Sequence, residues 1–85
     1  MTYQVIIEKK AQKEAAKIPV QYRGAVDKAI TSLSSNPRPH NSKKLTEREG
    51  YRIRVGNYRI LYTIDDKAKI AIIYRIKIKS KAIYK

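Results

Sequence analysis

Residues 51–62, with the sequence YRIRVGNYRILY, decide the fold of this chain. Successive residues of a strand point to opposite faces of a sheet, and Gly56-Asn57 is a two-residue signal for a hairpin turn. A hairpin centred on that pair places Arg54 opposite Arg59 and has one apolar and one basic face. The apolar face then contains Tyr51, Ile53, Val55, Tyr58, Ile60 and Tyr62, and the basic face contains Arg52, Arg54, Arg59 and Leu61.

The repulsion between the opposed charges of Arg54 and Arg59 must be screened by water or offset by an anion. Like charges directly opposite each other destabilise a strand pair by roughly a few tenths of a kcal/mol to 1 kcal/mol. The whole chain is basic as well, because 20 Lys and Arg against 7 Asp and Glu give a formal charge of +13 on 85 residues. This excess indicates an acidic partner, either a nucleic acid or an acidic protein.

Two short helices are predicted between an early strand and the hairpin. Residues 3–7 are rich in strand-forming residues, and a helical pattern begins at Glu8 and is broken by Pro19. A second helix follows and ends before Asn36-Pro37. The apolar residues at helical spacing are Ala11, Ala15 and Ile18 in the first helix and Tyr22, Val26, Ala29, Ile30 and Leu33 in the second.

The last third of the chain is predicted to continue the sheet. Residues 43–45 can form a short strand before the hairpin, and a turn at 65–67 leads to a final strand over about 69–78. If the turn preserves the register, Ile70, Ile72, Tyr74, Ile76 and Ile78 share the apolar side, and Ala71, Ile73, Arg75, Lys77 and Lys79 share the other. The cations on one surface are then Arg52, Arg54, Arg59, Arg75, Lys77 and Lys79.

These elements predict one α+β domain over residues 1–85, with a helical hairpin packed on a mainly antiparallel sheet of three to four strands. The order is βααβββ or βααββββ. The chain contains no cysteine, so it forms no disulfide and no thiolate metal site, and we expect no metal and no cofactor. It shows neither a secretory signal nor an apolar run long enough for a bilayer, which predicts a cytoplasmic protein without membrane contact.

The sequence resembles the RelE/ParE superfamily of bacterial and archaeal toxins from type II toxin–antitoxin pairs, and in particular its RelE branch. The resemblance covers nearly the whole chain. It rests on the early strand before a Lys-rich helical hairpin, on NPRP at 36–39, on KKL at 43–45, and on YRIRVGNYRILY followed by an acidic turn and an Ile-rich strand. It implies an mRNA endonuclease that cuts messages in the ribosomal A site. It also implies a RelB-like antitoxin that wraps around the toxin, a monomeric free toxin and a heterotetrameric complex.

The resemblance also implies which residues act on RNA. The family's basic positions on the first hairpin strand fall on Arg52 and Arg54, its second-strand arginine falls on Arg59, and its C-terminal tyrosine falls on Tyr84. Many relatives carry a Gly-His-Arg or Gly-Lys-Arg run before that tyrosine. Here the tail reads RIKIKSKAIYK, which has neither the glycine nor the histidine.

The resemblance implies that a lysine of this tail takes the place of the family's catalytic cation. Lys77, Lys79 and Lys81 are the candidates. We choose Lys79 because it is predicted to lie on the same side of the last strand as Arg75 and Lys77. Lys77 and Lys81 are expected to contact RNA together with Arg75. Tyr84 lies in a polar stretch where it can stack on a base.

The chemistry divides these residues into two groups. Cleavage of RNA by its own 2′-hydroxyl needs a base, an acid and positive charge around the phosphorane-like transition state. Arginine supplies only the charge, because it stays protonated. Proton transfer therefore falls to Lys77, Lys79 or Tyr84. His40 is a weaker candidate, because it lies in a Pro-rich loop far along the chain from the basic face.

Three functions remain open at this point. An mRNA endonuclease is favoured because the hairpin cations match the RNA-cutting branch. A ParE-like poison of DNA gyrase would share the fold but bind a protein, and a non-catalytic relative would bind RNA or antitoxin without stopping growth. A basic strand face can also be merely solvated. The tyrosines predicted to pack in the core or at its rim, not to stack on bases, are Tyr51, Tyr58, Tyr62 and Tyr74.

Overall fold

The hairpin over residues 51–62 forms with the predicted register. β3 (Tyr51–Val55) and β4 (Tyr58–Asp65) are antiparallel, and Arg54 lies opposite Arg59. Gly56 has a φ of 60°, a left-handed conformation that residues with a side chain rarely adopt, which explains the glycine at the turn. The structure is a computed structural model, and it describes residues 2–46 and 48–78.

The remaining elements complete the order βααββββ, one of the two predicted orders. They are β1 (Gln4–Ile7), α1 (Lys9–Ala16), α2 (Val20–Ser32), β2 (Ser42–Lys44) and β5 (Ile70–Ile78). The described residues form five strands in the sheet order β1-β5-β4-β3-β2, which is more than the predicted three or four. The difference arises because β1 joins one edge, parallel to β5, while the short β2 joins the other edge, antiparallel to β3. The predicted α+β class is confirmed.

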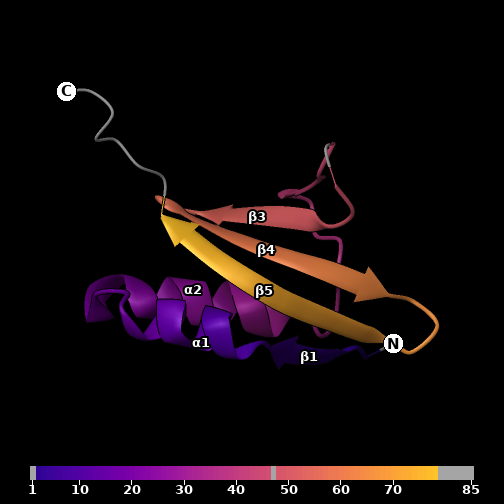
Figure 1. Cartoon of the computed structure of the whole chain (residues 1–85), viewed down its shortest axis with the longest axis horizontal. Helices are drawn as coiled ribbons and strands as arrows, with labels where there is room; N and C mark the ends of the chain where they lie inside the picture. The colour runs from indigo at the N-terminus through magenta and orange to yellow at the C-terminus, as the bar shows by residue number, and fades with distance from the viewer. Residues whose placement is uncertain (1, 47, 79–85) are drawn as a thin grey trace.

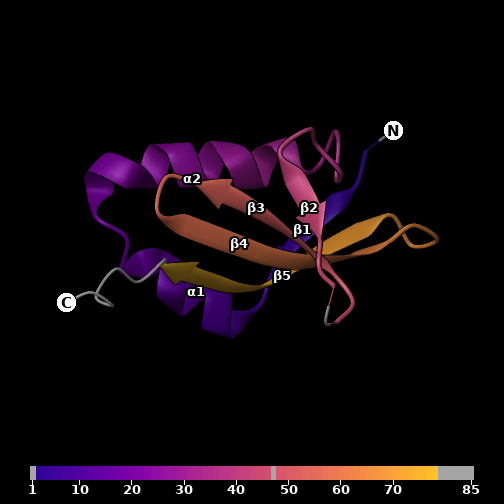
Figure 2. The same ribbon diagram turned by 90° about the horizontal axis from the view of Figure 1, so that it is seen from above.

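Both helices cover the same side of the sheet (Figure 1). Seen from above, α2 lies toward β3 and α1 toward β5 (Figure 2). We call the side of the sheet opposite the helices the outer face. Within the described residues no helix covers the outer face. Neither described helix is both long and apolar enough to cross a membrane.

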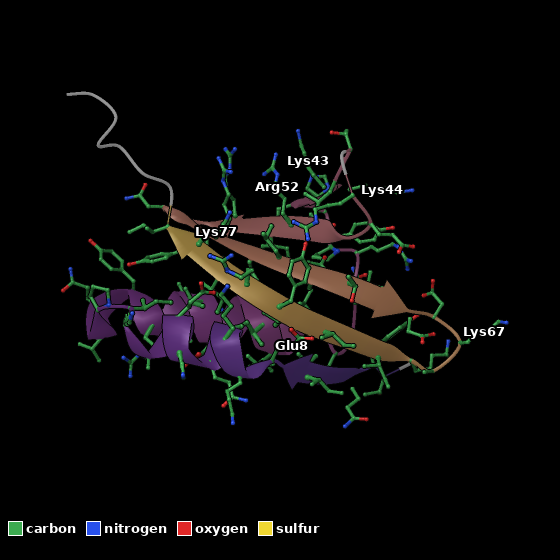
Figure 3. All side chains as sticks on the ribbon, viewed as in Figure 1. Glu8, Lys43, Lys44, Arg52, Lys67 and Lys77 are labelled. Atoms are coloured by element: carbon green, nitrogen blue, oxygen red, sulfur yellow. The ribbon has the colours of Figure 1, made fainter. Side chains whose placement is uncertain are left out.

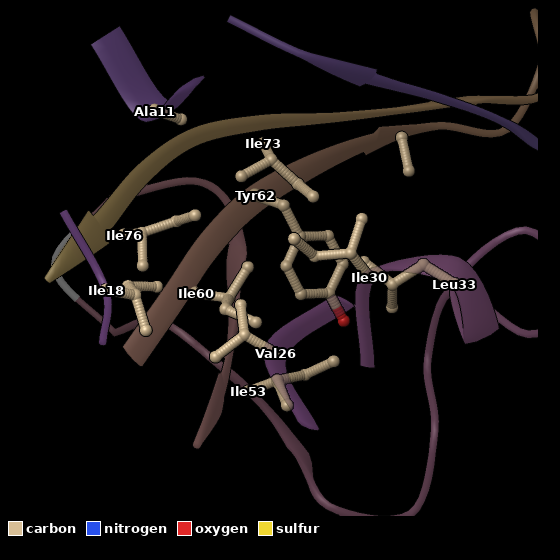
Figure 4. Packing of buried hydrophobic residues seen from close by; sticks show 11 residues of the cluster. Ala11, Ile18, Val26, Ile30, Leu33, Ile53, Ile60, Tyr62, Ile73 and Ile76 are labelled. Carbon is tan, nitrogen blue, oxygen red and sulfur yellow. The ribbon is translucent and has the colours of Figure 1, made fainter. Parts of the chain in front are cut away.

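The core lies between the helices and the inner side of the sheet (Figure 4). Its fully enclosed large side chains are Val26, Leu33, Ile53, Ile60, Tyr62 and Ile73. Of the tyrosines predicted to pack in the core or at its rim, Tyr62 is buried, and Tyr51 and Tyr58 are partly buried against the core. Tyr22 was expected in the apolar stripe of its helix, but it is 50% exposed and contacts the ring of Tyr58 instead.

The predicted alternation of the last strand is wrong for its first half. Leu61 lies opposite Arg75, but Tyr62 lies opposite Ile73, so Tyr74 has no partner on β4. This extra residue is a β-bulge, which reverses the alternation of side chains along the strand. Ala71 therefore faces the core in place of its neighbours in sequence. The prediction that Ile70, Ile72 and Tyr74 share the apolar side is overturned, whereas the predicted sides of Arg75 and Lys77 hold.

Candidate nucleic-acid interface

Pairing across the strands arranges the basic side chains of the outer face in two neighbouring rows. The first row contains Lys43, Arg52, Leu61 and Arg75, in the order of the strands β2 to β5. The second row contains Arg54, Arg59 and Lys77 on β3, β4 and β5. We call the six cations of these rows the cationic face. Figure 3 shows Lys43 and Arg52 projecting from the sheet on the side away from the helices.

The second row brings three cations together without an acidic partner among residues 2–46 and 48–78. Neighbouring strands lie about 4.8 Å apart, so Arg54, Arg59 and Lys77 are close neighbours across the sheet. Among the residues that the structure describes, no carboxylate forms an ion pair with any of them. The Nε of Arg59 is enclosed and has no hydrogen-bond partner there. A donor left in this state costs roughly 1–3 kcal/mol. The crowding of like charges in this row favours a bound anion.

Arg75 differs from the other cations of the face, because it has a partner inside the protein. Its Nε donates to Oε2 of Glu14 at 2.9 Å. Oε1 of Glu14 accepts a hydrogen bond from the backbone N–H of Ile76 at 2.7 Å. The pairing of β1 with β5 stops at Ile73, so Glu14 takes the place of a strand at the edge of β5 beyond that point. The charge of Arg75 is therefore compensated, and its contact with RNA stays a prediction.

A groove of about 660 Å³ opens at this edge of the sheet, next to the second row of cations. Its lining combines apolar and charged side chains. Arg59 and Lys77 belong to both the groove and the second row, so the two are continuous. The groove is lined by Glu14, Lys17, Ile18, Tyr58, Arg59, Arg75, Ile76, Lys77 and Ile78.

The other predicted site residues divide into three groups. Lys79, Lys81 and Tyr84 lie outside the described residues. His40 is exposed in the loop between α2 and β2 and is not part of the cationic face. Lys43 belongs to the face but was not predicted to do so. Its short strand was recognised from the sequence, and the pairing of Lys43 with Arg52 would have assigned it to the outer face.

A separate cluster explains the NPRP stretch and holds no free cation. Arg38 donates from Nη2 and Nη1 to the two carboxylate oxygens of Asp66 at 2.9 and 3.2 Å, and from Nε to the hydroxyl of Tyr51 at 3.0 Å. Tyr3 donates its hydroxyl to Asp66 at 2.6 Å. We call Tyr3, Arg38, Tyr51 and Asp66 the loop clamp, because they tie the loop after α2 to the β4–β5 turn.

The loop clamp perturbs the titration of its members. The hydrogen bonds from Arg38 and then from Tyr3 lower the pKa of Asp66 from 3.8 to about 2. The same contacts act in the opposite direction on the donors, since the hydrogen bond to Asp66 raises the pKa of Tyr3 and that of Arg38. Each shift favours the protonation state that makes the contact, namely the ionised Asp66 and Arg38 and the neutral hydroxyl of Tyr3.

Comparison with known proteins identifies the family. A profile described as "ParE toxin of type II toxin-antitoxin system, parDE" matches residues 5–83. No curated protein matches the sequence. Solved structures do match, and toxins of the RelE type are among them.

An archaeal RelE in the RelE–RelB complex from Pyrococcus horikoshii has 26% sequence identity and a TM-score of 0.80, and the match covers 95% of this chain and 99% of that one. A chain of the toxin–antitoxin complex RelBE2 from Mycobacterium tuberculosis has 30% identity and a TM-score of 0.79, and the match covers 92% of this chain and 99% of that one. The isolated E. coli RelE toxin shares the fold, with 20% identity and a TM-score of 0.80. This match covers 93% of this chain and 86% of that one. The chain thus belongs to the ParE toxin family of type II toxin–antitoxin systems, in the RelE branch of the RelE/ParE superfamily.

Proposed function

We propose that this toxin is a ribosome-dependent endonuclease that inhibits translation by cutting mRNA in the ribosomal A site. The observation that carries the proposal is the second row of the cationic face, in which Arg54, Arg59 and Lys77 stand side by side without an acidic partner in the described chain. Three adjacent cations on a rigid sheet form a site for a phosphate that gains negative charge during a reaction.

The residues of the face have different roles in this proposal. Arg54 and Arg59 stabilise the pentacoordinate phosphate that forms when the 2′-hydroxyl attacks, because guanidinium groups stay charged and bind phosphate oxygens in pairs. Arg52 and Lys43 lie in the neighbouring row and hold the phosphate of the adjoining nucleotide. Proton transfer is assigned to Lys79 and Tyr84, as the family resemblance implies, and Lys77 and Lys81 add RNA contacts.

The ribosome supplies what a small basic surface lacks. Correct placement of the attacking and leaving groups can lower a barrier by roughly 7–11 kcal/mol, so a site with a weak base still works if the message is held in position. The reaction then takes place only on ribosome-bound mRNA, which sets the cytoplasm as its location.

We further propose that a RelB-like antitoxin holds the toxin inactive in a heterotetrameric complex. The Pyrococcus horikoshii and Mycobacterium tuberculosis structures are complexes of toxin and antitoxin. The charge of +13 on this chain gives a physical reason, because an acidic segment that folds on binding would neutralise the cationic face.

The test is induced expression in cells, followed by measurement of growth and mapping of mRNA ends. Wild type should stop growth and leave messages cut within codons. Arg59→Ala should do neither. Lys67→Ala is the matched control, because it removes the same charge from an exposed turn and should remain toxic.

Two outcomes would support the alternatives. Growth arrest with DNA damage signalling and intact messages would assign the chain to the gyrase poisons. This alternative is retained because the matching family model is that of the ParE toxin. RNA affinity without growth arrest would indicate a non-catalytic relative. A fully toxic Arg59→Ala protein would contradict the proposed site directly.

A further inference from the structure

The β-bulge places an aromatic ring on the cationic face. Ile73 and Ile76 are both buried in the core, although an uninterrupted strand would point them to opposite sides. The two residues between them, Tyr74 and Arg75, therefore both lie toward the outer face, where Arg75 is opposite Leu61. Tyr74 is partly exposed there.

A loop arginine covers this ring. The Cζ atom of Arg48 lies 5.4 Å from the centroid of the Tyr74 ring, within the range of a cation–π interaction. The loop that carries Arg48 is closed by a hydrogen bond of 2.9 Å from the N–H of Leu45 to the carbonyl of Gly50. Gly50 packs tightly enough that a Cβ atom would lie 2.9 Å from the carbonyl oxygen of Tyr62. The base of this loop is thus fixed on the sheet, while Arg48 itself is exposed.

The ring lies among cations and beside an apolar side chain. Leu61 occupies the first row between Arg52 and Arg75, and Arg59 precedes it by two residues on the same strand. The hydroxyl of Tyr74 is enclosed and has no hydrogen-bond partner among the described residues, so the only contact found there for its polar or aromatic groups is that of Arg48 with the ring. An aromatic platform flanked by basic side chains is the arrangement with which proteins bind single-stranded nucleic acids.

We propose that the Tyr74 ring is a stacking platform for one unpaired RNA base and that Arg48 is its exchangeable cover. The base replaces the guanidinium on the ring, and Arg48 turns to a backbone phosphate. This inference rests on the proposed function for its ligand and adds a base-binding site to it.

The charges around the platform favour a nucleotide over a protein side chain. Arg48 lies over the ring, Arg52 and Arg59 belong to the same face of the sheet on β3 and β4, and none of the three forms an ion pair in the described chain. A base that stacks on Tyr74 brings a phosphate on either side of itself, whereas an aromatic side chain brings no charge. The nucleotide therefore satisfies both the ring and its basic surroundings.

The absence of tryptophan from the chain makes a direct test possible. In Tyr74→Trp the new indole is the only one, and stacking of a base should quench its fluorescence. The ligands are a single-stranded 2′-O-methyl hexanucleotide, which cannot be cut, and an abasic strand of the same length and charge. We expect quenching with the first strand and none with the second.

Affinities of three further variants complete the test. Tyr74→Leu should bind the base-containing strand about tenfold more weakly and the abasic strand as tightly as wild type does. Tyr74→Phe keeps the ring and should keep the affinity. Tyr22→Leu removes a half-exposed tyrosine from α2 and should leave both affinities unchanged.

The contrary results have distinct meanings. Equal losses for both strands in Tyr74→Leu would show that the ring only supports the fold or the position of Arg48, and would overturn the platform. Unchanged RNA affinity together with weaker antitoxin binding would overturn it in favour of a protein contact. Because the strands are not cut, these affinities are separate from activity: wild type that leaves messages intact in cells refutes the proposed function alone.

Discussion

The loop clamp and the cationic face use arginine in opposite ways. In the loop clamp, all three guanidinium nitrogens of Arg38 donate to oxygens of Tyr51 and Asp66. On the cationic face, the Nε of Arg59 is enclosed without a partner in the part of the chain that the structure describes, and its neighbours across the sheet are Arg54 and Lys77. The first arginine is satisfied by the fold, and the second is left for a ligand.

The difference follows from where the sequence places its few carboxylates. Residues 51–64, which form most of the central hairpin, contain no Asp or Glu. Asp66 comes just after them and reaches Arg38, while Glu14 reaches Arg75 from α1. Arg38 and Arg75 are thus paired inside the protein by these acids, whereas Arg54 and Arg59 meet no carboxylate within the described chain.

The largest expected effect on cleavage comes from removing Arg59, the central cation of the second row. Arg59→Ala should slow the cutting of mRNA on programmed ribosomes by about 100- to 1000-fold, which is typical for the loss of one preorganised donor to a developing anion. Its melting temperature should not fall, because the enclosed Nε has no partner within the described protein to lose and its removal ends the cost of an unsatisfied donor. Single-turnover cleavage and a melting curve measure the two quantities. If Arg59→Ala instead lost much stability and cut mRNA normally, Arg59 would be a structural residue like Arg38, which would contradict the comparison.

The loop clamp should give the opposite pattern. Arg38→Ala should lower the melting temperature by roughly 4 °C, since solvent screens a pair whose side chains are 43% and 56% exposed. Cleavage on ribosomes at a temperature well below the melting point should stay near that of wild type. Lys67→Ala, which changes the same charge in an exposed turn, should leave the melting temperature unchanged. A cleavage defect as large as that of Arg59→Ala would place Arg38 in the site.

Acid should remove the contribution of Asp66. Its folded-state pKa of about 2 lies below the usual 3.8, so the unfolded chain takes up the proton first as the pH falls. The stability from this carboxylate is present above about pH 4 and is lost between pH 4 and 2. The melting temperatures of wild type and Asp66→Asn should therefore differ at pH 5 and converge toward pH 2. A difference that stays constant over this range would show that Asp66 does not titrate as described.

The parts of the fold that depend on neighbouring residues could be predicted from the sequence. Gly56-Asn57 and the alternation around it were enough for the register of the hairpin, and Pro19 was enough to separate the helices. The bulge at Tyr74 could not be predicted in this way. It depends on how β5 twists to meet both β1 and α1, and only the packed structure contains those contacts.

The same limit applies to the site. The opposed pair of Arg54 and Arg59 follows from the turn alone and was predicted. The neutralisation of Arg75 by Glu14 joins residues 61 positions apart, and the position of Lys43 depends on how β2 pairs with β3. Patterns along the chain do not specify contacts of this kind. Yet these contacts decide which of the predicted cations remain available to a ligand.

The central claim is that the outer face binds RNA through cations that the fold leaves unpaired, and the salt dependence of RNA affinity tests it most directly. For single strands, the logarithm of the affinity falls with the logarithm of salt concentration by about 0.7 per neutralised phosphate. Arg54→Ala should reduce the magnitude of this slope by about 0.7, measured with an uncleavable single strand. Lys67→Ala, with the same loss of charge in a turn outside the cationic face, should leave the slope unchanged. Equal slopes for the two variants would mean that RNA senses only the net charge of the protein, and would contradict a specific binding face.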